Sequence, residues 1–438
     1  MQIDKTTLND LSIFAHEEEQ SVFHHINFTR TIGGKDWLKH FISKPLPTIH
    51  AIQETQLLLQ RIIHIHDQWP INITNGTVMV LEKFYDTSIN EIPQNANAID
   101  AGLYTIFSGP DYSLVKYSVV HFTEFIKGLH TTVQLLNNSD NPSVLSVILE
   151  RIKILLNKPE LQKIIAEEKG KKISNAEILR RGYFFHRQFK DQCSELIEIY
   201  SKLDAWYSMA TACKQFQLGF PLFMETVQPV FSAEGLYHPL LSTPVAYDEA
   251  LTPEQNFLFL TGANMAGKST FIKAVGVAVY LAHIGMGVPA KAMQLSFFDG
   301  LLSNIQVVDN IIQGESYFFN EVQRIRKTIE KIKDGKKWLI LIDELFKGTN
   351  VQDAMKCSTT VIEGLRKMHN TIFILSTHLY EIGESLKQYP NIQFRYFETE
   401  VKDDELLFSY QLKNGISNDR LGFLILKREG VVEMLKEL

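Results

Sequence analysis

The sequence predicts a mixed architecture, in which an all-α region precedes an α/β domain with a glycine-framed loop. Two short apolar runs predict the α/β part: Phe257–Leu260 opens into a glycine-framed loop, and Trp338–Ile342 ends in adjacent carboxylates. The all-α part is predicted by long stretches with apolar residues at helical spacing, which end near residue 229. We therefore expect one domain over residues 1–229 and a second over residues 230–438.

The N-terminal part is predicted to contain a long antiparallel helical hairpin over about residues 143–217. Helical patterns cover 143–168 and 175–217, and only a short polar tip separates them. The second pattern carries an apolar stripe at i, i+3, i+4, i+7 spacing from Leu196 to Ala210. The segment between Pro70 and Pro110 is richer in Asn, Gly and Pro, and we expect it to contain loops.

The 438-residue chain has the composition of a protein with two folded domains, since 45% hydrophobic residues suffice for two cores. Its 3 cysteines lack metal-ligand spacing, which fits a reducing compartment without disulfides. Because there is neither an N-terminal signal pattern nor an apolar stretch near the ~20 residues of a membrane helix, we expect a cytoplasmic protein without membrane contact. The net charge of −6 means that any DNA contact must be local.

The glycine-framed loop has the pattern G-x-x-x-x-G-K-S, and each fixed residue meets a demand of a polyphosphate. Gly262 and Gly267 let the backbone turn its N–H groups toward phosphate oxygens, Lys268 supplies a cation, and the Ser269 hydroxyl can ligate Mg²⁺. A helix expected over about 269–281 adds the positive end of its dipole. The alternative is an ordinary glycine-rich strand-to-helix turn, but the apolar strand before the loop favours phosphate binding.

Two further strand ends carry polar residues suited to phosphoryl chemistry. Asp343 ends its apolar run where it can hold the Mg²⁺ shell, and Glu344 can orient an attacking water. Another apolar run, Thr371–Ser376, is followed by His378, which could sense a γ-phosphate from the sheet edge. Taken singly, the alternatives are a solvated acidic turn and a structural histidine. Their order after a phosphate loop favours catalytic roles.

Two more segments follow the loop in sequence order. Residues 313–321 enter a helix through Gly314 and Ser316, which offer a hydroxyl and backbone N–H groups at a positive helix end. An ordinary serine N-cap is the alternative for this segment taken alone. The polar loop 346–353 has the length of loops that bridge paired ATPase subunits.

These motifs together resemble those of the MutS family, the DNA mismatch-recognition ATPases related to the ABC superfamily. The pair Asn264 and Met265 inside the loop is more particular than a generic phosphate loop. The matching segments, in family order, are 261–270 to TGPNMGGKST, 287–290 to VPA, 314–318 to GRSTF, 343–350 to DEIGRGTS and 376–378 to ATH. The resemblance implies an ABC-type ATPase domain over 230–438, preceded by a helical core and lever domain over 1–229.

The resemblance also implies how ATP and Mg²⁺ are bound and used. Catalysis would fall to Glu344, His378 and Lys268, and Mg²⁺ would be held by Ser269 and Asp343. The implied nucleotide contacts are Gly262, Asn264, Met265, Gly267, Lys268, Ser269, Thr270 and an adenine-stacking aromatic, for which Tyr247 is the candidate. Ala263 and Ala266 depart from the family loop, and both are tolerable there.

A homodimer through the ATPase domains is implied as well, with Ser316 acting in trans on the γ-phosphate held by the opposite subunit. Resemblance to the family's helical core begins near Thr31, so we expect the mismatch-reading domain to be absent. The predicted hairpin tip leaves no room for the DNA-encircling clamp, and the end at Leu438 leaves little room for C-terminal dimerising helices. Mismatch specificity then has no visible source.

A basic cluster at the predicted hairpin tip is the candidate DNA contact. Its members are Lys169, Lys171, Lys172, Arg180 and Arg181. Contacts there would be to phosphates and salt-sensitive, but a solvated tip is the favoured interpretation of such a charge cluster.

Three functions remain open. The first is an ATP-hydrolysing, nucleotide-switched dimer that binds DNA in mismatch repair or related repair or recombination. The second is a nucleotide-switched scaffold that grips a protein or another nucleic-acid structure without recognising mismatches. The third is a catalytically weak interaction protein, against which the intact set of Lys268, Asp343, Glu344 and His378 argues.

Overall fold

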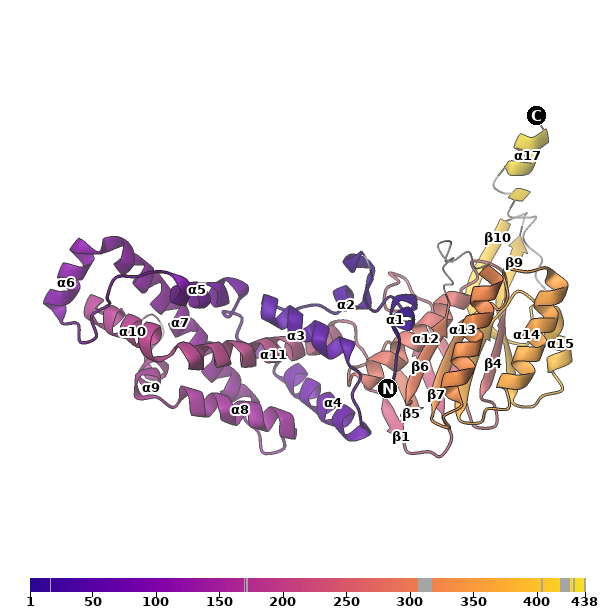
Figure 1. Ribbon diagram of the computed structural model, residues 1–438, viewed down its shortest axis with the longest axis horizontal. Helices are drawn as coiled ribbons and strands as arrows, with labels where there is room; N and C mark the ends of the chain where they lie inside the picture. The colour runs from indigo at the N-terminus through magenta and orange to yellow at the C-terminus, as the bar shows by residue number, and fades with distance from the viewer. Residues whose placement is uncertain are drawn as a thin grey trace. The chain divides into compact units, whose positions relative to one another are not determined.

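The computed structural model describes residues 1–15, 17–168, 170, 172–305, 317–402, 405–417, 426–427 and 430–436. The chain forms two compact units, whose elements are labelled in Figure 1. A sheet unit comprises residues 1–25, 45–52 and 216–438, and a helical unit comprises residues 26–44 and 53–215. The domain boundary at residue 229 stays a prediction. Contacts assign residues 216–229 and two N-terminal segments to the sheet unit.

The helical unit is arranged around α7, a 28-residue helix that spans Gly109–Leu136. Its buried residues lie on several sides because α5, α8, α9 and α10 all pack against it. The other helices of this unit are α3 (Ile32–Ser43), α5 (Asn75–Asp86), α6 (Ala98–Phe107), α8 (Ser143–Leu156), α9 (Pro159–Ala166), α10 (Asn175–Gln188) and α11 (Lys190–Gln215), while α4 (Ile49–His64) begins in the sheet unit.

The predicted hairpin is present in a different form. Its first arm is broken between α8 and α9, where Pro159 starts a new helix, and its second arm is broken at Phe189. Because α10 packs mainly against α7, the two arms do not form a simple pair. The segment between Pro70 and Pro110 contains loops and also α5 and α6, which begin at capping boxes on Thr74 and Asn97.

A buried aspartate fixes the start of the helical unit. Asp204 is fully buried on α11, and its carboxylate accepts hydrogen bonds from the backbone N–H groups of Arg30 and Thr31 and from the Thr31 hydroxyl at 2.8 Å. These bonds compensate the cost of burying a carboxyl group, which raises the pKa of Asp204. The segment at Arg30 and Thr31 is thus held against α11.

The sheet unit contains, among its described residues, a six-stranded sheet in the order β10-β9-β4-β8-β7-β6. Strands β9, β4, β8, β7 and β6 are parallel, and β10 is antiparallel to β9. Their bounds are β4 Phe257–Thr261, β6 Gly300–Asn304, β7 Trp338–Asp343, β8 Thr371–Ser376, β9 Ile392–Lys402 and β10 Glu405–Asn414. The carboxyl ends of β4, β7 and β8 therefore meet at one edge, as expected for a parallel sheet.

Helices cover both faces of this sheet (Figure 1). Apolar residues of α13 (Tyr317–Ile332), α14 (Val351–Leu365) and α15 (Glu381–Leu386) form one core with Ile340 and Ile342 of β7. The buried helix α12 (Lys268–His283) covers the opposite face, where its Gly276 lies against Leu341. A four-stranded sheet in the order β1-β5-β2-β3 consists of Leu222–Met224, Ala292–Ser296, Phe231–Leu236 and Tyr247–Leu251.

The first residues of the chain pack at the β6 edge of the larger sheet. Gln2 forms a parallel bridge with Gly300, and helix α1 (Lys5–Asp10) follows. Asp10 accepts hydrogen bonds from the Ser303 hydroxyl at 2.5 Å and from the Ile305 N–H at 3.1 Å. The N-terminal segment thereby belongs to the sheet unit. The described part of this unit also contains the short helices α2 (Val22–His25) and α17 (Val431–Lys436), with the 3₁₀ turn Glu18–Gln20 before α2.

Candidate nucleotide-binding site

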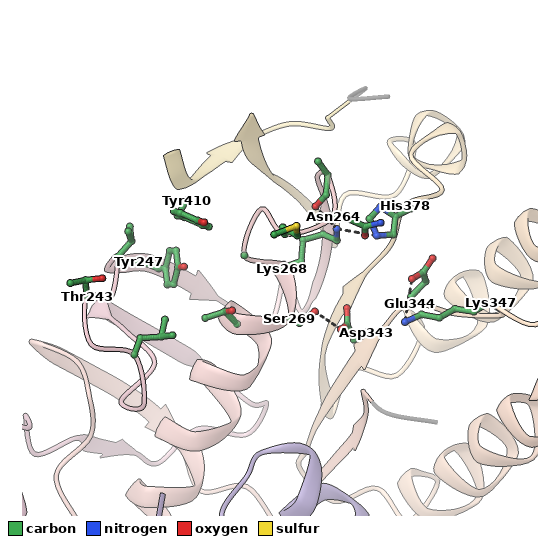
Figure 2. A pocket seen from close by; sticks show the side chains of 16 residues that line it. Thr243, Tyr247, Asn264, Lys268, Ser269, Asp343, Glu344, Lys347, His378 and Tyr410 are labelled. Atoms are coloured by element: carbon green, nitrogen blue, oxygen red, sulfur yellow. Dashed lines mark hydrogen bonds and ion pairs between the residues drawn. The ribbon is translucent and has the colours of Figure 1, made fainter. Parts of the chain in front are cut away.

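A cavity of about 500 Å³ opens at the carboxyl ends of β4, β7 and β8. Figure 2 shows Tyr247 and Tyr410 on one side of it and Asp343, Glu344 and Lys347 on the other. The lining residues are Leu241, Thr243, Val245, Tyr247, Ala263, Asn264, Met265, Gly267, Lys268, Ser269, Thr270, Asp343, Glu344, Lys347, His378 and Tyr410. The predicted residues of the loop and of the three strand ends are thus brought together, except that Gly262 is not among the lining residues.

The loop between β4 and α12 has the backbone conformation that its glycines predict. Gly262 and Gly267 have φ angles of 141° and 112°, which L side chains rarely adopt. A Cβ on Gly262 would also lie 3.2 Å from the backbone oxygen of Phe397. Met265 takes a φ of 67° with its side chain exposed. Helix α12 begins at Lys268, so the loop ends at the positive end of a helix dipole.

Lys268 is buried, and its ammonium group is held by the loop itself. The Nζ atom donates to the carbonyl oxygens of Gly262 at 2.8 Å and Ala263 at 2.9 Å, and lies 3.2 Å from Nε2 of His378. Burial lowers the pKa of Lys268 to about 8, although Asp343 and Glu344 act in the opposite direction. A cation in this position faces the cavity with its charge only partly compensated.

Asp343 and Ser269 form the candidate metal-binding pair. The Ser269 hydroxyl donates to Oδ2 of Asp343 at 2.5 Å, and the Ser376 hydroxyl donates to Oδ1 of the same carboxylate. A carboxylate and a hydroxyl suit part of an octahedral Mg²⁺ shell, in which waters and phosphate oxygens supply the other ligands. No cluster of three or more His, Cys, Asp or Glu residues able to hold a metal occurs in the described ranges. The pair of Ser269 and Asp343 suits a metal whose other ligands come from a polyphosphate and from water.

Glu344 lies in a constrained turn at the end of β7. Its φ is 68° and that of Phe346 is 61°, so two non-glycine residues occupy the left-handed region within one loop. The Glu344 N–H donates to the carbonyl oxygen of Ser376 at 3.0 Å, and its side chain forms an ion pair with Lys347 at 3.2 Å. The carboxylate is therefore held at the cavity wall by both its backbone and its side chain.

The far side of the cavity is aromatic. Tyr247 is buried, and its ring packs edge-to-face on Phe271 at 5.4 Å and on Phe397 at 5.8 Å. Tyr410 of β10 is 41% exposed and lines the same cavity. Tyr247 thus lies in the lining. The sequence did not point to four other lining residues, which are Leu241, Thr243, Val245 and Tyr410. It singled out the loop that contains Lys347 but gave Lys347 itself no role.

Several predicted site residues fall elsewhere. Ser316, Lys169 and Lys171 lie outside the described residues. Arg181 is buried and forms ion pairs with Glu167 at 2.5 Å and Glu177 at 3.0 Å, and Arg180 also pairs with Glu177. Arg181 is therefore not an exposed phosphate contact in this conformation. DNA contact by the remaining tip residues stays a prediction.

The sequence of this chain is similar to those of known proteins that share one ATPase domain. Residues 258–435 match the family of MutS domain V, an ATPase domain. The chain is 26% identical over 285 residues to the DNA mismatch repair protein MutS of Petrotoga mobilis, covering 63% of this chain and 34% of that protein. It is 29% identical over 260 residues to MutS protein homolog 4 of Homo sapiens, covering 54% of this chain and 27% of that protein.

A third relative, the DNA mismatch repair protein MutS of Oceanobacillus iheyensis, is 29% identical over 301 residues, which cover 64% of this chain and 33% of that protein. The matches thus span about a third of the length of these relatives. Over residues 258–435 the chain belongs to the MutS family, and it corresponds to only part of a MutS chain. None of the helices within the described ranges is both long and apolar enough to cross a membrane.

Proposed function

We propose that the chain binds ATP with Mg²⁺ in this cavity and hydrolyses it, as an ABC-type P-loop ATPase. The observation that carries the proposal is the convergence of Lys268, the Ser269–Asp343 pair, Glu344 and His378 on one cavity. The volume of about 500 Å³ suits a nucleotide, and the loop at the start of α12 suits its phosphates.

Each side chain has a role that its position suggests. Mg²⁺, held by Ser269 and Asp343, would neutralise charge on the β- and γ-phosphates. Lys268 would exchange its bonds to the carbonyl oxygens of Gly262 and Ala263 for phosphate oxygens. Glu344 would orient the attacking water, with His378 beside the γ-phosphate.

The proposed site also includes contacts to the nucleobase and a serine from a second subunit. Tyr247 and Tyr410 would border the nucleobase at the aromatic end of the cavity. Ser316 would act in trans, in a homodimer that closes through the ATPase domains, and hydrolysis would switch that dimer between states. We place the protein in the cytoplasm.

For the biological role, we propose nucleotide-switched DNA binding in mismatch repair or related repair or recombination. The support is the MutS domain V match and the relatives, which include two mismatch repair proteins and MutS protein homolog 4. The alternative is a nucleotide-switched scaffold that grips a protein or a non-mismatch nucleic-acid structure. The pairing of Arg180 and Arg181 with acidic neighbours favours this alternative, because it removes basic charge from the predicted DNA contact.

Steady-state ATP hydrolysis with and without Mg²⁺ tests the first proposal. Lys268→Ala should lose nucleotide binding, whereas Glu344→Gln should keep binding and lose turnover by about 10²-fold or more. Parent-like turnover by Glu344→Gln would exclude the role given to Glu344. Parent protein that neither binds nor hydrolyses ATP would overturn the proposed activity.

Binding titrations on homoduplex, mismatched, branched and single-stranded DNA, with and without ATP and at several salt concentrations, separate the two biological roles. A preferred structure with ATP-dependent affinity supports the DNA role. Equal, weak and strongly salt-dependent affinity for all four would exclude specific DNA recognition and would support a scaffold that grips a protein.

A further inference from the structure

A buried carboxylate outside the cavity holds the loop that carries Glu344. Glu321 lies near the start of α13 with 5% of its surface exposed. Its Oε1 accepts a hydrogen bond from the backbone N–H of Lys347 at 3.1 Å, and its Oε2 accepts one from the N–H of Gly348 at 3.3 Å. Both oxygens of one side chain thus bind successive amides of the loop.

The loop needs such support because its backbone is strained. Glu344 and Phe346 both have positive φ angles, and a non-glycine residue in the left-handed region costs on the order of 1 kcal/mol. The Phe346 ring is buried in the core beside the β-sheet and packs on Phe318 of α13 at a centroid distance of 5.6 Å. Helix α13 therefore fixes the loop through a hydrophobic contact and a polar one.

The polar contact suits an ionised carboxylate in particular. Burial raises the pKa of Glu321, and the two N–H bonds act in the opposite direction. A glutamine of the same size could accept only one of these bonds, and its NH₂ group would face the other N–H. The amide left without an acceptor would be partly buried, which costs about 1–3 kcal/mol.

We propose that Glu321 is a positioning residue for ATP hydrolysis, which holds the loop at 344–348 so that Glu344 faces the cavity. The inference rests on the proposed function. Glu321 does not line the cavity, so it acts through Glu344 and Lys347, whose side chains form an ion pair at 3.2 Å. Its loss should reduce turnover and leave nucleotide affinity nearly unchanged.

The test compares Glu321→Gln with parent and with Glu330→Gln in the full chain. Glu330 is exposed on the same helix and pairs only with the neighbouring Arg326 among the described contacts, so it is the matched control. We expect Glu321→Gln to lower kcat by about 10- to 100-fold, as for a catalytic group displaced by about 1 Å, and to change ATP affinity less than about threefold. Glu330→Gln should match the parent.

A double variant separates positioning from a general structural effect. In a Glu344→Gln background, Glu321→Gln should lower the residual rate by less than about twofold, because Glu321 acts through a side chain that is already lost. An equal loss in both backgrounds would overturn the inference. If the parent hydrolyses ATP and Glu321→Gln has the same kcat as the parent, the inference is overturned as well. A parent without ATPase activity would instead refute the proposed function.

Hydrogen exchange reads the contact without any turnover. In the unliganded parent, the amides of Lys347 and Gly348 should be protected. Glu321→Gln should expose at least one of them while the exchange of the β7 amides stays the same. Unprotected amides in the parent would overturn the inference even if the variant folds poorly.

Discussion

The ammonium nitrogen of Lys268 lies 3.2 Å from Nε2 of His378. An ammonium group can only donate a hydrogen bond, so Nε2 is the acceptor and the imidazole proton resides on Nδ1. Burial lowers the pKa of His378, and the neighbouring Lys268 charge lowers it further. The cavity therefore pairs one cation with a neutral histidine at neutral pH, which leaves the positive charge on the residue that would meet the phosphates.

ATP affinity should fall as the pH rises above about 8. Burial lowers the pKa of Lys268 to about 8, so the free chain loses this charge above that value. Because a polyphosphate binds the charged form, binding at higher pH requires proton uptake, and affinity should decrease by up to about tenfold per pH unit. A fluorescent ATP analogue titrated at a series of pH values measures this. Lys268→Arg, which stays charged, should give a flatter profile, and equal slopes for both proteins would contradict the assignment.

Tyr410→Ala should weaken ATP binding without weakening triphosphate binding. The Tyr410 side chain is partly exposed at the aromatic end of the cavity, away from Asp343 and Glu344 (Figure 2). Stacking of a base on an aromatic ring contributes about 1–3 kcal/mol, so ATP affinity should drop by about tenfold. Competition of ATP and of inorganic triphosphate against a fluorescent analogue compares the two ligands. Tyr389→Ala, a tyrosine outside the lining, is the control. Equal losses for both ligands would place Tyr410 near the phosphates instead.

The sequence predicts those site residues that lie in one continuous motif or at the end of an apolar strand. Gly262 to Ser269 form one continuous segment at the end of β4. Asp343 ends one buried parallel strand and His378 lies two residues beyond another, so a shared sheet edge brings them together. Tyr410 lies on β10, which joins the sheet antiparallel to β9 and carries no motif of its own. Nothing near it in sequence links it to the cavity.

Some elements of the helical unit could not be predicted from the sequence either. The sequence pattern does not predict helix α7 as one continuous element. Its buried residues lie on several sides, so it lacks the single apolar stripe that identifies a surface helix. The capping boxes that start α5 and α6 were present in the sequence at Thr74 and Asn97. They lie in a segment whose Asn, Gly and Pro content indicated loops.

The sheet unit should lose stability as the pH falls below about 6.5. His283 is fully buried, its Nδ1 lies 2.8 Å from the Val279 carbonyl oxygen, and its Nε2 accepts the Phe298 N–H at 3.0 Å. Both ring nitrogens are thus satisfied by the neutral form, and burial lowers the pKa of His283 to about 3. Since the folded pKa is depressed, the unfolded chain binds the proton first. The stabilisation is complete above about 6.5 and is lost as the pH falls toward about 3.

This linkage predicts a loss of about 2 kcal/mol in the free energy of unfolding between about pH 7 and about pH 5 from His283 alone. Urea unfolding at the two pH values measures the change. His283→Gln should be less stable at neutral pH and should show a smaller pH dependence, whereas substitution of the exposed His369 by Gln should leave both unchanged. An unaltered pH dependence in His283→Gln would contradict the prediction.

Gly276→Ala should destabilise the sheet unit, although alanine normally stabilises a helix interior by about 1 kcal/mol relative to glycine. A Cβ at this position of α12 would lie 2.5 Å from Cδ2 of Leu11 and 2.7 Å from Cδ1 of Leu341, both of which are fully buried. Overpacking of this kind costs about 1–3 kcal/mol, so the sign of the change in the free energy of unfolding reports how closely Leu11 and Leu341 pack against the helix.

Leu11→Ala removes one of the two clashes but also leaves a cavity. The double variant should therefore be more stable than the sum of the two single losses predicts. Urea unfolding of the four proteins measures this coupling. Strict additivity, or stabilisation by Gly276→Ala alone, would show that Leu11 does not pack against α12, and the N-terminal segment would then lie elsewhere.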